Sequence, residues 1–130
     1  MTPRQAETSL ARFVLAMLLL YVSLKIWFSV SYGLSNLFYL VDIVGMTLLL
    51  WGSLRSLDAR PDLSPGVLCA GIAWTASHAW RATAWRVDAF RQGVTIDGGA
   101  GMIWLLGAAT IIALVCLAIT LLLVVESRRT

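Results

Sequence analysis

The stretch Met102–Val125, MIWLLGAATIIALVCLAITLLLVV, decides the fold class of this 130-residue chain because it contains no charged residue. A helix rises about 1.5 Å per residue, so this stretch is long enough to cross the roughly 30 Å hydrocarbon core of a bilayer. Only 13% of the residues are charged and the mean hydropathy is +0.82, whereas soluble domains carry about 25% charged residues. The composition therefore predicts an integral membrane protein.

The first half of the chain predicts a tight helical hairpin. One helix is expected over about residues 10–32, and the capping-box pattern of Thr2 and Gln5 indicates an earlier start. A second helix is expected over about residues 37–54. The short connection at residues 33–36 is rich in turn formers, so the two helices are predicted to lie antiparallel and side by side.

The second half predicts another helical pair. Its first helix is expected over about residues 65–92, following the helix-start signal of Ser64 and Pro65. Only the part up to Trp80 is apolar enough for lipid, so the part after residue 80 is predicted to be interfacial. The last helix is expected over residues 102–125.

Together these spans predict an all-α fold, an integral membrane four-helix bundle with antiparallel, up-and-down helices in a single transmembrane domain over residues 1–130. Arginine placement favours both termini in the cytoplasm, because six arginines fall on that side and three on the other. The six are Arg4, Arg12, Arg55, Arg60, Arg128 and Arg129, and the three are Arg81, Arg86 and Arg91. We expect a multi-pass protein of the cell inner membrane.

A polar intramembrane cluster is the candidate functional site. Lys25 lies eight residues before Gly33 and Asp42 nine after it, which places both about 12–14 Å from the turn on adjacent helices. His78 is expected at the same depth, and Arg81 follows it on the same helical face.

Three interpretations of the cluster stay open. Isolated charges near mid-membrane cost about 2.5–3.5 kcal/mol on insertion scales, so a Lys25–Asp42 bridge that only fixes the hairpin is the first. The second is an ion or proton relay through Asp42 and His78. The third is a solvated site without either role. The lone histidine also leaves a haem ligand open, but we expect no cofactor, no metal site and no catalytic residue.

Two further sets of residues are expected at the surfaces of the helices. Small residues that allow close backbone approach predict helix packing, within the bundle or with a partner; they are Gly66, Ala70, Ala73, Ser77, Ala109 and Ala113. Tryptophans at the two membrane interfaces are expected to act as anchors; they are Trp27, Trp51, Trp80, Trp85 and Trp104.

The sequence favours a non-catalytic role. We expect an accessory or assembly subunit of a larger membrane complex, because no hydrolytic triad, paired carboxylates or metal-ligand spacing is present in the sequence. The alternatives are an oligomeric pore, such as an ion channel or a phage-type holin, and a small proton-coupled transporter that uses Asp42. The expected partners are the lipid bilayer and other membrane subunits or further copies of the chain, and nucleic acid is not expected because no basic stripe is present.

Overall fold

A computed structural model describes residues 1–33, 36–58 and 64–129 of the chain. The described residues form four helices and no strand, which confirms the predicted all-α class. The helices are α1 (Pro3–Tyr32), α2 (Asn36–Leu57), α3 (Gly66–Arg91) and α4 (Gly99–Arg129). Leu34, Ser35 and Arg60, which the sequence assigns to connections, lie outside the described residues.

Helix α1 begins where the capping box predicted. The Thr2 hydroxyl accepts a hydrogen bond from the Gln5 amide, and the Gln5 side chain accepts one from the Thr2 amide. These bonds satisfy donors that a helix start otherwise leaves free. The helix ends at Gly33, whose φ of 87° suits glycine, and the Gly33 amide donates to the Ser29 carbonyl.

The start of α3 differs slightly from the expectation. The helix begins at Gly66, one residue after the predicted start at Pro65, and no side chain caps it. The Ser64 hydroxyl instead accepts a hydrogen bond from Nε of Arg55, at 2.9 Å. The Ser64 hydroxyl, which the sequence predicted to cap the helix, is therefore hydrogen-bonded to the Arg55 guanidinium instead.

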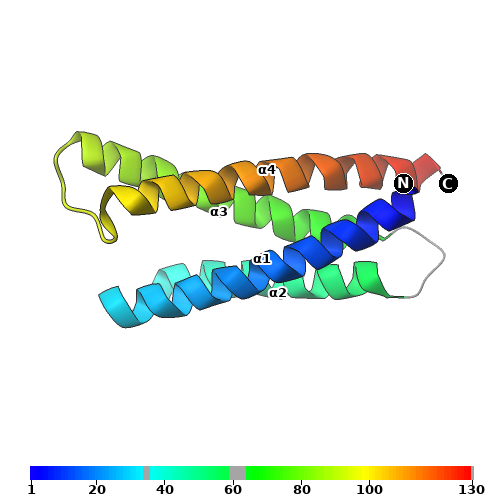
Figure 1. The fold of residues 1–130 in the computed structure, drawn as a ribbon, viewed down its shortest axis with the longest axis horizontal. Coiled ribbons are helices and arrows are strands. Elements are labelled where there is room, and N and C mark those ends of the chain that lie inside the picture. Colours follow the sequence, from blue (N-terminus) through cyan, green and yellow to red (C-terminus); the bar gives the residue numbers. More distant parts are fainter. Residues whose placement is uncertain (34–35, 59–63, 130) are drawn as a thin grey trace.

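Consecutive helices run in opposite directions, and both termini lie at the same end of the molecule (Figure 1). Helix α3 packs against both α4 and α2, and α1 packs mainly against α2. The contact between α1 and α4 is much smaller. Helix α3 therefore occupies a central position, although it is the most polar of the four helices by sequence.

Two glycines set the close approach of α2 and α3. A Cβ atom added at Gly52 would lie 2.5 Å from the Cα atom of Leu68, and one added at Gly71 would lie 2.9 Å from the backbone nitrogen of Leu49. Both distances are shorter than any carbon contact allows, so the helices cross with backbone against backbone. This contact holds α3 onto the α1–α2 hairpin.

Three helices are long and apolar enough to cross a membrane: α1, the Tyr39–Leu57 part of α2, and α4. Helix α3 is not among them. Large apolar side chains lie exposed along these helices, including Leu19 at 73% exposure and Leu122 at 71%. Water would make such a surface costly, whereas hydrocarbon is a favourable environment for it.

The small residues that the sequence analysis singled out on α3 and α4 lie mostly at the surface of the bundle. Gly66, Ala70 and Ser77 are exposed, and Ala73 is only partly buried. On α4, Ala109 is exposed and Ala113 is partly buried. The expectation of packing within the chain is therefore wrong for the exposed positions, because α3 turns its opposite sides to α2 and α4. Packing against a partner stays a prediction.

Candidate functional site: a buried carboxylate between three helices

The site is centred on Asp42 in α2, whose side chain is only 2% exposed. The Nζ atom of Lys25 in α1 lies 2.5 Å from Oδ2 of Asp42. The minimal connection between α1 and α2 places the two residues at one level, so the charge pair expected from the register is present. The paired charges lower the cost that either one would carry alone in hydrocarbon.

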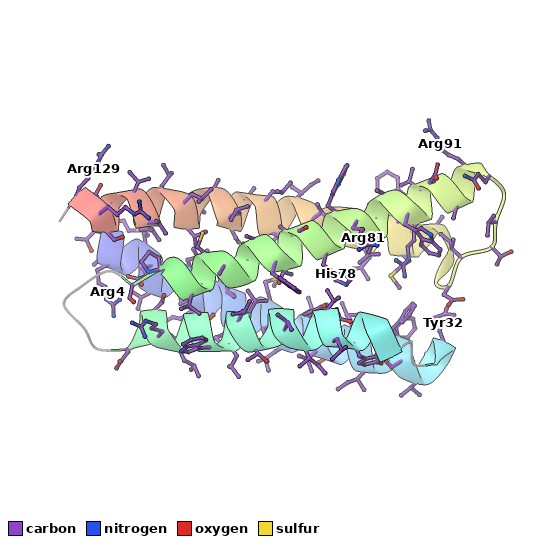
Figure 2. All side chains as sticks on the ribbon, turned by 180° about the vertical axis from the view of Figure 1, so that it is seen from behind. Arg4, Tyr32, His78, Arg81, Arg91 and Arg129 are labelled. Atoms are coloured by element: carbon purple, nitrogen blue, oxygen red, sulfur yellow. The ribbon has the colours of Figure 1, made fainter. Side chains whose placement is uncertain are left out.

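Two further groups reach the other carboxylate oxygen. The Tyr21 hydroxyl, one helical turn before Lys25 on α1, donates a hydrogen bond to Oδ1 of Asp42. From α3, Nε2 of His78 lies 3.3 Å from the same oxygen. Figure 2 shows His78 between α3 and α2. The carboxylate therefore has partners on both neighbouring helices and joins α1, α2 and α3 at one point.

The electrostatics of the cluster are balanced. It contains one carboxylate and one ammonium, and the ammonium also lies over the ring of Tyr39, 5.5 Å from its centroid. The Tyr39 hydroxyl is in turn hydrogen-bonded to the Ser29 hydroxyl. Oδ2 of Asp42 accepts no well-aligned hydrogen bond among the described residues, so the Lys25 charge is its main compensation.

One residue beside the cluster was not anticipated from the sequence. Nε1 of Trp74 donates a hydrogen bond to the carbonyl oxygen of Val41, at 3.0 Å. Val41 directly precedes Asp42, so the indole fixes α3 to α2 next to the carboxylate. A tryptophan inside an apolar segment gives no sign in sequence of a backbone partner on another helix.

Arg81 is not part of the cluster. Its side chain is exposed, and it is not among the partners of Asp42 in the described part of the chain. Figure 2 shows it one turn beyond His78 on α3. The sequence analysis grouped Arg81 with His78 because their spacing puts them on one face of the helix. Among the described residues, His78 contacts Asp42 of α2 and Arg81 does not.

A second buried carboxylate lies near the chain termini, and the sequence analysis missed it. Glu7 has no exposed surface; its Oε1 accepts the Ser64 amide at 3.1 Å and its Oε2 lies 3.0 Å from Nη1 of Arg4. The other guanidinium nitrogen of Arg4 donates to the Asp58 carbonyl. The i,i+3 spacing of Arg4 and Glu7 was the available signal.

The predicted tryptophan anchors all lie on the surface. Exposure is 53% for Trp27, 54% for Trp51, 62% for both Trp80 and Trp85, and 81% for Trp104. Amphipathic rings in such positions suit the boundary between headgroups and hydrocarbon. Their contact with lipid stays a prediction.

The described residues contain no group of three or more histidine, cysteine or acidic side chains placed to hold a metal ion. The contacts of Asp42 with Lys25 and His78 support two chemical roles: an internal ion pair that joins helices, and a titratable site between them. Comparisons with protein-family models, with curated proteins and with solved structures find no match. Function is accordingly inferred from the residues and their arrangement.

Proposed function

We propose that this chain is a multi-pass inner-membrane protein and a non-catalytic accessory or assembly subunit of a larger membrane complex. Its four helices cross the bilayer as an antiparallel bundle with both termini in the cytoplasm. The common end of the termini supports this topology, as does the excess of arginine there (Figure 1). Helix α3, too polar to cross alone, is flanked by α2 and α4.

The observation that carries the subunit role is the open face of α3, defined as the exposed residues Gly66, Ala70, Trp74, Ser77, Arg81, Ala84 and Asp88 on one side of the helix. These positions follow one another at spacings of three and four residues, so they share one side of the helix. Apart from Trp74, whose indole donates to the Val41 carbonyl of α2, the side chains of this face are small or polar and offer lipid little apolar area. A protein helix fits this face better than lipid does.

The test is co-purification from native membranes in polymer-bounded lipid discs. We expect wild-type protein to purify with a second chain in fixed ratio. Ser77→Leu, which adds bulk to the open face, should lose that chain. Ala118→Leu, at an exposed position of α4, is the matched control and should retain it. Purification of the wild-type chain alone, or equal retention by both variants, would contradict the proposal; multiple copies of this chain alone would favour a pore.

The second candidate is a small proton-coupled transporter, favoured by the contact between His78 Nε2 and Asp42 Oδ1. Here an imidazole and a carboxylate meet between three helices, an arrangement common in proton relays within membranes. The test is proton uptake into vesicles that contain a pH-sensitive dye. Asp42→Asn should abolish uptake, and Asp88→Asn, at an exposed carboxylate, should not. Uptake that is absent in wild type or intact in Asp42→Asn would remove this candidate.

A further inference from the structure

A shallow groove separates the end of α3 from the start of α4. Its volume is about 280 Å³, and its walls are Val87, Phe90, Arg91, Ala100, Ile103 and Trp104. Pockets for drug-sized ligands span roughly 300–1,000 Å³. The groove is therefore too small for a complete amphiphile but wide enough for a segment of an alkyl chain.

The walls of the groove combine apolar and charged side chains. Phe90 and Trp104 offer apolar surface, with exposures of 57% and 81%. Arg91, the last residue of α3, contributes an exposed guanidinium. Figure 2 shows Arg91 at the end of the molecule opposite Arg4 and Arg129. The groove thus combines an apolar wall with one cation.

The start of α4 adds donors for an anion. Ala100 is in the first turn of this helix, which holds no acidic residue. Backbone amides in a first turn lack partners within the helix and carry partial positive charge. Asp88 and Asp97 lie nearby in the sequence but do not line the groove. Asp88 accepts a hydrogen bond from Nε2 of Gln92, at 3.4 Å.

A second shallow cavity at the other end of the molecule provides a contrast. It lies between the start of α1 and the end of α4, and it has an apolar wall of similar kind that includes Ala6 and Leu122. Its lining includes the Glu126 carboxylate and Met1 with its terminal amino group. A lining carboxylate therefore distinguishes the two cavities: the α3–α4 groove has none, whereas the other has Glu126, which disfavours an anion there.

We propose that the groove between α3 and α4 binds one glycerophospholipid of the outer leaflet, a proposal that rests on the membrane topology given above. The phosphodiester contacts the Arg91 guanidinium and the α4 amides that follow Gly99, whose own amide donates to the Ile96 carbonyl. An acyl segment lies against Phe90, Ile103 and Trp104. Arginine suits this role because its planar donors can meet two phosphate oxygens at once.

Native mass spectrometry of the full chain tests the proposal. Protein from vesicles of phosphatidylcholine and phosphatidylglycerol is transferred to mild detergent, and the fraction that retains one phospholipid is measured. We expect Arg91→Ala to weaken retention by about tenfold, as for the loss of a charge-assisted hydrogen bond. Arg128→Ala, a surface arginine at the opposite end, should leave retention unchanged. A Trp104→Ala variant should also lower retention.

The outcomes separate this proposal from the one on which it rests. Equal retention by wild type and Arg91→Ala, or equal loss in Arg91→Ala and Arg128→Ala, would overturn the groove as a site. Displacement of the lipid by inorganic phosphate alone would do the same, since it would show that the alkyl chain contributes nothing. Failure of the membrane topology would show instead as labelling of engineered cysteines at Thr2 and Thr95 from the same side of the bilayer.

Discussion

At the residue scale, Asp42 makes polar contacts with side chains of two neighbouring helices. Its two oxygens contact the side chains of Lys25, Tyr21 and His78, which come from two neighbouring helices. A carboxylate with 2% exposure is tolerable only because these partners replace water. The loss of one partner should therefore cost more than the loss of a whole pair.

The first prediction concerns Lys25 and Asp42. Asp42→Asn leaves the Lys25 ammonium without its counter-charge, and we expect the free energy of unfolding in mixed micelles to fall by about 2.5–3.5 kcal/mol. Asp88→Asn is the surface control and should change little. The double variant Lys25→Met/Asp42→Asn should lose less than the sum of the single variants. Strictly additive losses, measured by circular dichroism, would show that the charges do not interact.

The second prediction concerns Glu7. Glu7→Ala removes the acceptor of the Ser64 amide, so that amide should exchange its hydrogen faster, by the factor expected for about 1–3 kcal/mol. Glu7→Gln keeps a carbonyl acceptor and should preserve most of the protection. Hydrogen–deuterium exchange with mass spectrometry reads out the effect. Unchanged protection in Glu7→Ala would mean that the bond does not hold α3 to the start of α1.

At the scale of elements, α3 differs from the other helices in being central and polar at once. It lies between α2 and α4, and it meets α2 through glycines rather than through interlocking large side chains. Close backbone approach increases van der Waals contact, which is a main source of helix association where no hydrophobic effect acts between helices. This contact also sets the distance at which Trp74 and His78 can reach α2.

The third prediction tests this crossing. Gly52→Ala places a methyl group against the backbone of Leu68, so we expect α2 and α3 to separate and the protein to lose about 1–3 kcal/mol of stability. Gly107→Ala is the matched control, because its added methyl group meets no other atom within 4 Å and alanine favours a helix. Thermal unfolding in detergent compares the two. A Gly52→Ala variant as stable as wild type would disprove the tight crossing.

At the scale of the whole molecule, the arrangement places both termini at one end and the α3–α4 connection at the other (Figure 1). Exposed apolar side chains lie along all four helices, and α3 also presents the open face. The molecule therefore has a lipid-compatible surface and a distinct side suited to protein. This division is the structural basis of the proposed subunit role.

The fourth prediction concerns topology. In a variant with Cys69 and Cys116 replaced by serine, single cysteines at Thr2 and Thr95 should react with a membrane-impermeant maleimide from opposite sides. Thr2 should react only after the cells are opened, because arginine-rich ends stay in the cytoplasm. A cysteine that replaces Arg128 should likewise react only after the cells are opened. Labelling of Thr2 and Arg128 from opposite sides would contradict an even number of crossings.

The sequence by itself determined the helical class, the approximate helix limits and the Lys25–Asp42 pair. Each depends on local information: an uncharged run such as residues 102–125, a capping box at Thr2, and a short connection that fixes register. Only the tertiary structure decided which side of α3 is buried. Small residues lie on several faces of this helix, so their pattern in the sequence does not predict which face packs against its neighbours. The Glu7 and Trp74 contacts likewise join residues far apart in sequence, and no local pattern specifies their partners.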